Sequence, residues 1–353
     1  MMENLEQYFN LRDNDFDSQI LIDDRDFEIY FKHLETMILI RFTENLLAEK
    51  RKTGKIGGPV HLAAGQEAIA VGISSVLSQN DFVFSAHRSH AHLLALDPNP
   101  YGLFAEVLGR STGLSRGFGG SMHLWNGRSG FYGSVPIVSG TIPLAVGSGL
   151  ASKLRGSESI GVAYFGDGAM EEGVVHESLN LASKLEIPIL FVCENNLFSS
   201  HLHINERQPS IFNARFAKAH QIESRVIDGN NVKSVFETSK ELVSYIRKKQ
   251  RPAFLEAFTY RLYGHVDWRE DIDVGVGRSS ADLNKWKSRD PIKRLKSALG
   301  INEKLIEKLA QIEQDINKRI IQDWEKAESD SFPNDSELTT NVYISDVRNT
   351  DVV

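Results

Sequence analysis

Two polar motifs, each close behind an apolar run, carry the residue types best suited to chemistry in this sequence. Asp167 lies between Gly166 and Gly168, and after 26 further residues comes the pair Asn195-Asn196. Carboxylate and amide oxygens suit a hard cation such as Mg²⁺, which takes few protein ligands and prefers phosphate and water oxygens for the rest. Glycine on both sides of Asp167 lets the backbone approach a ligand closely. The motifs therefore predict a site for magnesium and a diphosphate group.

The elements around these motifs must bring them together. Residues 160–165 and 189–193 read as strands and residues 170–184 as the helix between them, which is a βαβ unit with parallel strands. Ligands bind at the carboxyl edge of such a sheet, and a helix that starts near Met170 presents its N-terminus to an anion. A second alternation follows, with a strand residue at Val226, a turn at 228–229, a helix over 232–249 and a strand over 253–260. The sequence therefore predicts an α/β fold with a mostly parallel sheet flanked by helices.

The rest of the chain divides into helical and glycine-rich stretches. Residues 27–53 and 65–77 have helical spacing, and an apolar stripe runs along the second of two helices expected over 291–300 and 302–329. Eight glycines between 111 and 140 predict a backbone that approaches a ligand, with a floppy surface loop as the alternative. Residues 264–280 lack periodicity and are interpreted as a mobile loop. We expect an arm (1–26), a diphosphate-binding domain (27–290), C-terminal helices packed on the domain or on a partner (291–330) and a tail (331–353).

Composition narrows the class of protein. The 353 residues carry a formal net charge of −7, which disfavours a nucleic-acid partner, and no apolar run has the roughly 20 residues of a membrane span. Cys193 is the one cysteine, so the chain by itself builds no disulfide framework and no cysteine-based metal site. Residues 1–26 are rich in acid, unlike a transit peptide or a secretory signal. We expect a cytoplasmic protein.

The motifs and their order resemble a known family. Gly166-Asp167-Gly168 and Asn195-Asn196, with expected strands before both, resemble the thiamine-diphosphate signature. The surrounding motifs narrow the resemblance to the α subunit of the decarboxylating component of pyruvate, branched-chain 2-oxo acid and acetoin dehydrogenase complexes. The matching pieces run in the family's order from about residue 27 to 330: His61-Leu62, Gly65-Gln66-Glu67-Ala68, His87-Arg88-Ser89-His90, Gly119-Gly120-Ser121-Met122-His123, Phe165 to Gly168, Glu194-Asn195-Asn196, Asp228-Gly229, and Thr259-Tyr260-Arg261 leading to Gly264-His265.

The resemblance implies a role for individual residues. Mg²⁺ would be bound by the side chains of Asp167 and Asn196 and by the carbonyl oxygen of Phe198. Arg88 would neutralise the diphosphate, and His265 would be the catalytic histidine near the substrate. The implied contacts to thiamine diphosphate are His87, Arg88, Pro136, Val138, Gly166, Asp167, Gly168, Ala169, Asn196 and His265.

The resemblance also implies a reaction and partners. A 2-oxo acid would be decarboxylated, or an acyloin such as acetoin cleaved, and the acyl unit passed to a lipoyl group on an acyltransferase. The glutamate that activates the cofactor comes from a separate β chain in this family, so we expect two α with two β chains and an inactive isolated chain. The alternatives are a thiamine-diphosphate-dependent carboligase or decarboxylase without a lipoyl partner, and a non-catalytic binding module.

Some positions depart from the family's pattern. His87 stands where tyrosine is common in the family. Ser199 and Ser200, after Phe198, depart from the commoner family motif, which contains glycine. Val266 lacks the hydroxyl that is phosphorylated in some mitochondrial members, so that regulation should not apply. The acidic loop that follows leaves the substrate and the acceptor open. The roles of His61, His90, His123 and of the 266–280 loop also stay open.

Overall fold

The core of the chain is a six-stranded sheet in which every strand pair is parallel. The computed structural model describes residues 13–266, 268–270, 272–273, 276–300 and 303–339. The strand order is β2-β1-β3-β4-β8-β7, so the two central strands are neighbours in the predicted βαβ unit. The predicted α/β fold with a parallel sheet is confirmed. The strands are β1 (Phe82–Ser85), β2 (Phe131–Ser134), β3 (Gly161–Gly166), β4 (Ile189–Asn195), β7 (Glu223–Asp228) and β8 (Ala253–Phe258).

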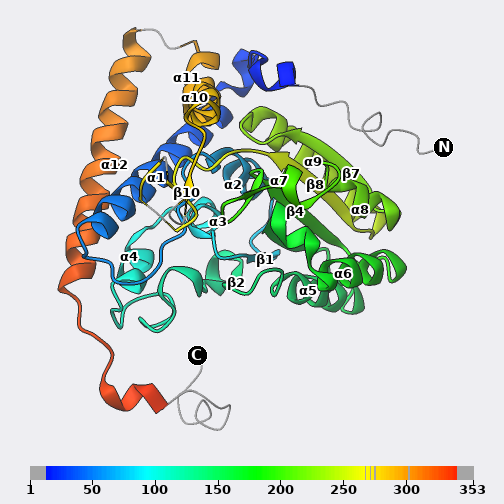
Figure 1. Cartoon of the computed structure of the whole chain (residues 1–353), viewed down its shortest axis with the longest axis horizontal. Helices are drawn as coiled ribbons and strands as arrows, with labels where there is room; N and C mark the ends of the chain where they lie inside the picture. The colour runs from blue at the N-terminus through cyan, green and yellow to red at the C-terminus, as the bar shows by residue number, and fades with distance from the viewer. Residues whose placement is uncertain (1–12, 267, 271, 274–275, 301–302, 340–353) are drawn as a thin grey trace.

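Helices cover both faces of the sheet (Figure 1). Alternate residues of β4 divide between two hydrophobic clusters, with Leu190 and Val192 in one and Phe191 and Cys193 in the other. The first cluster is closed by α1 (Phe27–Lys52), α2 (Glu67–Ser74), α3 (His90–Leu96), α4 (Tyr101–Val107) and α9 (Val232–Lys249). The second is closed by α5 (Ile142–Leu154), α6 (Gly173–Lys184) and α8 (Ala214–Ala219). Burial on both faces explains why β4 is apolar without alternation.

The C-terminal helices pack on the same core. These are α10 (Ser280–Ser288), α11 (Pro291–Ala298) and α12 (Glu303–Ser329). Helix α12 runs beside α1 and α4 (Figure 1), and the predicted stripe faces them, since Leu309, Ile320 and Trp324 are buried there. Among the residues that the structure describes, no helix combines the length and the apolar character needed to cross a membrane.

The structure corrects several local predictions. The α-helix expected from Met170 starts at Gly173, because residues Asp167–Glu171 form a 3₁₀ turn first. For the glycine-rich segment it is the alternative, a floppy surface loop, that is wrong, because the segment contains β2 and the 3₁₀ turns Gly120–Met122 and Gly127–Ser129. Residues 264–280 contain a small hairpin of β9 (Ile272–Asp273) and β10 (Val276–Gly277), although 267, 271 and 274–275 lie outside the described residues. Strands of two residues are too short to give a period in the sequence.

The N-terminal end of the described chain packs on the domain. The N-terminal arm has 3₁₀ turns at Asp13–Asp17 and Asp24–Asp26, and buries Phe16 and Ile20. Its Asp17 carboxylate pairs with Arg289, with an Nε–Oδ1 distance of 2.8 Å. After α12 a 3₁₀ turn spans Asp335–Thr339. The remainder of the predicted arm (1–12) and tail (340–353) lies outside the described residues.

Candidate active site

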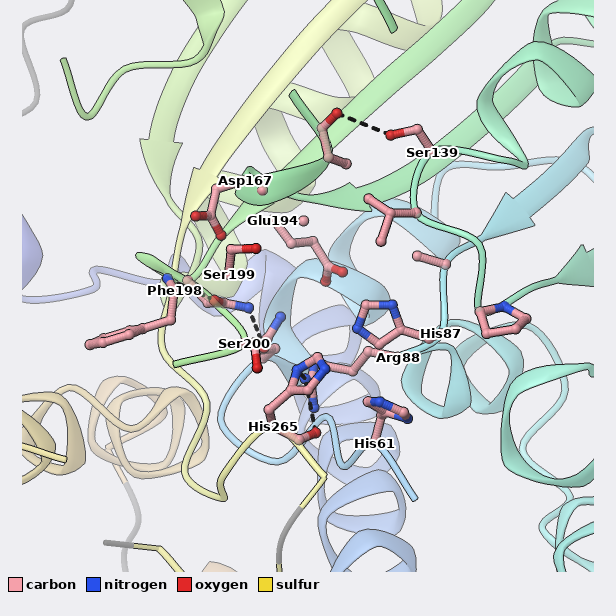
Figure 2. Close-up of a pocket in the computed structure, with 18 of the residues that line it drawn as sticks. His61, His87, Arg88, Ser139, Asp167, Glu194, Phe198, Ser199, Ser200 and His265 are labelled. Atoms are coloured by element: carbon pink, nitrogen blue, oxygen red, sulfur yellow. Dashed lines mark hydrogen bonds between the residues drawn. The ribbon is translucent and has the colours of Figure 1, made fainter. Parts of the chain in front are cut away.

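The two motifs meet at the carboxyl edge of the sheet. Strands β3 and β4 pair in register from Gly161 opposite Ile189 to Gly166 opposite Glu194, so the residues that follow them emerge side by side. Between them and the opposite wall is a cavity of about 280 Å³. Every predicted cofactor and metal residue lines it: His87, Arg88, Pro136, Val138, Gly166, Asp167, Gly168, Ala169, Asn196, Phe198 and His265. Asp167 and Phe198 lie on one side of the cavity, with His87 and Arg88 across from them (Figure 2).

Asp167 is the charged group at the end of β3. Its side chain is fully buried, and its Oδ2 accepts a hydrogen bond from the guanidinium of Arg207. Its Oδ1 has no hydrogen-bond partner among the residues that the structure describes. Burial raises the pKa of this carboxyl, and the positive charge of Arg207 opposes that shift. A buried carboxylate oxygen without a donor is what a bound cation would satisfy.

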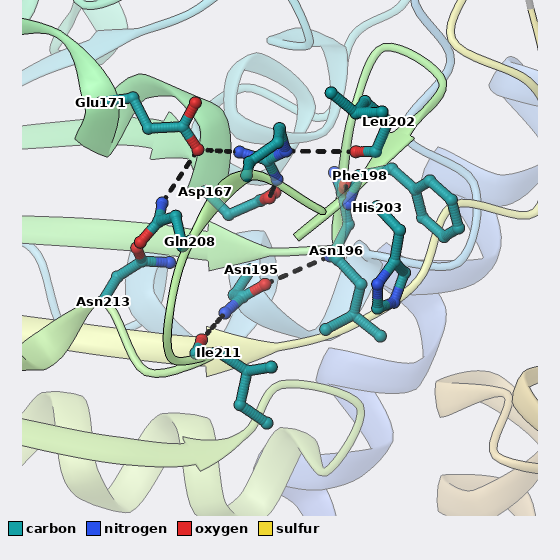
Figure 3. A network of polar contacts seen from close by, with 12 residues as sticks. Asp167, Glu171, Asn195, Asn196, Phe198, Leu202, His203, Gln208, Ile211 and Asn213 are labelled. Carbon is teal, nitrogen blue, oxygen red and sulfur yellow. Dashed lines mark hydrogen bonds and ion pairs between the residues drawn. The ribbon is translucent and has the colours of Figure 1, made fainter. Parts of the chain in front are cut away.

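The two asparagines have different positions: Asn195 supports the turn and Asn196 lines the cavity. Asn195 Nδ2 donates to the carbonyl of Ile211 (2.8 Å) and to the buried carboxylate of Glu256 (2.7 Å), so the first asparagine anchors the turn (Figure 3). Its Oδ1 accepts from the N–H of Leu197 (3.1 Å), whose φ of 70° lies in the left-handed region. The second asparagine, Asn196, then lines the cavity and accepts from the N–H of Phe198 at 3.2 Å.

Gly168 shows how closely the backbone is approached at this site. A Cβ on Gly168 would lie 2.5 Å from the Oγ of Ser199, so a larger residue fits only if Ser199 shifts. Ser139 Oγ donates to the carbonyl of the next residue, Ala169, at 3.0 Å, which fixes the peptide that follows. The Ser199 side chain thus fills the space next to Gly168. The helical end that faces the cavity belongs to the 3₁₀ turn that begins at Asp167, and α6 starts only later.

A cluster of one arginine and three histidines forms the opposite wall. Arg88 Nη1 donates to the carbonyl of Leu62 (2.6 Å), and its Nη2 lies 3.4 Å from both Nδ1 and the carbonyl oxygen of His265. The rings of His61, His87 and His265 pack edge to face, with centroids 4.6 to 5.3 Å apart. Burial and the charge of Arg88 lower the pKa of His87 and of His265 to about 3, and that of His61 further. The three rings are neutral near pH 7.

The other histidines that were singled out lie elsewhere. His90 belongs to helix α3; it is buried, with Nδ1 3.2 Å from Glu44 Oε2 and Nε2 2.9 Å from Ser121 Oγ. His123 is exposed, and its Nδ1 lies 3.0 Å from the carbonyl oxygen of Gly119. Neither lines the cavity.

Sequence reasoning missed several residues that line or support the site. The sequence alone assigns no role to His61 or Glu194, although the position of Glu194 directly before the Asn-Asn pair is a signal for it. Glu194 points into the cavity (Figure 2), and its Oε1 lies 3.2 Å from Nε2 of His92. Gln66, Ala86, Met122, Ser139, Ser199 and Ser200 complete the lining. Arg207 gave no signal, because its partner Asp167 lies 40 residues earlier.

The donor set fits a divalent cation and its phosphate ligands. A carboxylate with one unsatisfied oxygen, an amide and a nearby peptide carbonyl are oxygen donors of the kind that Mg²⁺ takes, and an arginine with neutral histidines stands across the cavity. Fold and site together define an α/β protein suited to bind a divalent cation with a diphosphate group.

Comparison with known proteins gives the family. Residues 34–336 match the model of the dehydrogenase E1 component, and the chain belongs to this family. Proteins of this family bind thiamine diphosphate, and their α subunits pair with β subunits. The resemblance found in the motifs is therefore confirmed.

The relatives are α subunits of two kinds of enzyme. The chain is 34% identical over 312 residues to the α subunit of acetoin:2,6-dichlorophenolindophenol oxidoreductase of Bacillus subtilis, which covers 88% of this chain and 92% of the relative. It is 33% identical over 315 residues to the pyruvate dehydrogenase E1 component subunit alpha of Rhizobium meliloti, covering 89% of each. The corresponding subunit of Rickettsia prowazekii is 32% identical over 318 residues, 90% of this chain and 96% of the relative.

Proposed function

We propose that this chain is the α subunit of a thiamine-diphosphate-dependent dehydrogenase that decarboxylates a 2-oxo acid or cleaves an acyloin. The acyl unit would pass to a lipoyl group on an acyltransferase partner. The observation that carries the proposal is the convergence of Asp167, Asn196 and Arg88 on one cavity at the carboxyl edge of the sheet. The two kinds of relative act on pyruvate and on acetoin by their names, which is consistent with a small carbonyl substrate. We place the protein in the cytoplasm.

Each wall of the cavity has a separate task. Asp167, Asn196 and the carbonyl of Phe198 would hold Mg²⁺, while the N–H groups of Gly168 and Ala169 would bind the diphosphate. Across the cavity Arg88 would neutralise the diphosphate, with His87 beside it. The backbone at Gly166, Pro136 and Val138 would complete the contacts. When bound, thiamine diphosphate supplies a thiazolium carbon that attacks the substrate carbonyl and takes up the electrons released on cleavage.

His265 is the residue proposed to meet the substrate. In the cofactor-free chain its ring is neutral near pH 7, because burial and Arg88 lower its pKa to about 3. A neutral imidazole accepts a hydrogen bond at one nitrogen and donates at the other, so it can orient a carbonyl or hydroxyl of substrate or acceptor. The β chain would supply the glutamate that activates the cofactor, in an assembly of two α and two β chains.

Calorimetry tests the proposal directly. We expect thiamine diphosphate to bind the complex of this chain with its cognate β chain only in the presence of Mg²⁺. Asp167→Asn and Asn196→Ala should each weaken that binding at least tenfold, since every ligand removed leaves the ion fewer oxygens. Ser129→Ala, in a polar turn outside the cavity, is the matched control and should bind as the unchanged protein does.

The outcomes separate the alternatives. A complex that binds neither ion nor cofactor would support the non-catalytic reading and overturn the proposal. A complex that binds both and consumes a 2-oxo acid, but never reduces and acylates a free lipoyl domain, would favour the carboligase or decarboxylase without a lipoyl partner.

A further inference from the structure

The two carboxylate oxygens of Asp167 are not equivalent. Oδ2 is bound to the guanidinium of Arg207, whereas Oδ1 has no hydrogen-bond partner among the described residues. Both belong to a fully buried side chain, so rotation of the carboxylate would exchange a satisfied oxygen for an unsatisfied one. The contact with Arg207 therefore fixes which oxygen is left for a ligand.

Arg207 is itself held on several sides. Its side chain is 6% exposed, its Nη1 pairs with Glu171, and its Nε donates to the carbonyl of Leu202 at 3.2 Å. Glu171 is held in turn by Nε2 of Gln208 at 2.9 Å (Figure 3). Because all three nitrogens of the planar guanidinium are engaged, Arg207 has one orientation relative to Asp167.

The same loop carries the other proposed metal ligands. After Asn196 the chain forms a small hairpin of β5 (Phe198–Ser199) and β6 (Leu202–His203), and then the short helix α7 (Ile204–Arg207). One continuous segment thus carries the Asn196 amide and the Phe198 carbonyl. The last residue of this segment, Arg207, pairs with Asp167 at the end of the neighbouring strand β3. Arg207, the last residue of this loop, therefore contacts a proposed metal ligand, Asp167, that lies outside the loop.

We propose that Arg207 is a positioning residue for the metal site: it holds Oδ2 of Asp167 so that Oδ1 is directed to the ion. The inference rests on the proposed function. Carboxylates that bind metals are commonly hydrogen-bonded through a second contact, and loss of such a partner typically costs about 10–100-fold in metal affinity. Arg207 and the ion use different oxygens, so both can be bound at once.

The opposite reading is that Arg207 is a substitute cation that the metal must displace. The two readings predict changes of opposite sign. Removal of a positive charge near the site favours cation binding by direct electrostatics, so the substitute-cation reading predicts tighter binding in Arg207→Gln and the positioning role predicts weaker binding.

The test measures Mn²⁺, which shares the oxygen-ligand preference of Mg²⁺, by electron paramagnetic resonance of the free ion. The αβ complex is titrated at saturating thiamine diphosphate. We expect Arg207→Gln to raise the Mn²⁺ Kd about 10–100-fold, and Arg207→Lys, which keeps the charge but not the fork, to raise it less. Arg251→Gln is the matched control, because Arg251 pairs with Glu186 on an exposed surface, and it should bind Mn²⁺ normally.

A second variant separates orientation from general loosening of the loop. Glu171→Gln removes the partner that anchors Arg207 and should also raise the Kd, and the double variant should be little worse than Arg207→Gln alone. Arg207→Gln binding Mn²⁺ as tightly as the unchanged protein, or more tightly, overturns the positioning role. Should Arg207→Gln fail to fold, an unchanged Kd in Arg207→Lys and Glu171→Gln overturns it equally. Unchanged protein that binds neither Mn²⁺ nor cofactor overturns the proposed function itself.

Discussion

Burial shifts the pKa of three side chains that line the cavity toward the neutral form. It raises the pKa of Asp167 and lowers the pKa of His87 and of His265 to about 3, so each shift favours the neutral form. A diphosphate would favour the protonated histidines, and a metal ion would favour the ionised carboxylate. A rise in pH should therefore weaken binding of the anion at the histidine wall and strengthen binding of the cation at Asp167.

The histidine wall should make the cofactor-free chain sensitive to acid. The folded-state pKa of His87 lies below its usual value of 6.5, so stability present above pH 6.5 is lost as the pH falls toward 3. At pH 5 the loss for one such residue is about 2 kcal/mol. His87→Tyr, which removes the imidazole, should remove that part of the loss between pH 7.5 and 5 in urea unfolding. The exposed His123→Asn should not, and identical pH profiles for His87→Tyr and the unchanged chain would refute the argument.

At the scale of elements, one buried carboxylate organises the glycine-rich segment. Glu106 at the end of α4 is 1% exposed and accepts four backbone N–H groups: Ser115 (2.6 Å), Gly117 (3.0 Å), Gly119 (2.7 Å) and Gly120 (3.1 Å). The chain wraps tightly around it, since a Cβ on Gly113 would lie 2.7 Å from the Cα of Glu106. This segment leads to Met122, which lines the cavity.

Replacing Glu106 by glutamine should loosen that segment. An amide has one acceptor oxygen and brings N–H donors against the remaining N–H groups, which costs about 1–3 kcal/mol. We expect hydrogen exchange of residues 115–120 to become at least tenfold faster in Glu106→Gln, with the sheet unchanged. Glu177→Gln on the exposed face of α6 is the control. Exchange that stays slow in Glu106→Gln would mean that the glycines hold their shape without the carboxylate.

The predictable part of the site consists of what is local in sequence. Strand β3, Asp167 and the following turn are contiguous, and so are β4 and Asn196, so an apolar run followed by a polar turn indicates both. Strands β1 and β2 escaped because each has four residues with serine or glycine among them, and only pairing beside β3 makes them strands. Arg207 and Glu106 escaped because their roles depend on which distant backbone or carboxylate lies opposite once the chain has folded.

At the scale of the whole molecule, α12 joins the C-terminal region to the glycine-rich segment. Trp324 is 3% exposed and packs edge to face on Phe104 of α4, with ring centroids 5.4 Å apart. Just beyond the helix, Asp330 accepts from Tyr101 Oη and Thr112 Oγ1, each at 2.5 Å, and Ser331 accepts from the N–H of Ser111. Helix α12 thus braces α4, the helix that carries Glu106.

Removing the indole of Trp324 should weaken the support that α12 gives to α4. Trp324→Ala deletes a buried aromatic ring, which costs about 3–5 kcal/mol. We expect a lower Tm and, because α4 loses its support, faster hydrogen exchange in residues 113–120 as well as in α12. Trp125→Ala is the matched control, since Trp125 is 55% exposed and its removal leaves no buried cavity. Faster exchange confined to α12 would show that this helix packs on the domain without supporting α4 and the glycine-rich segment.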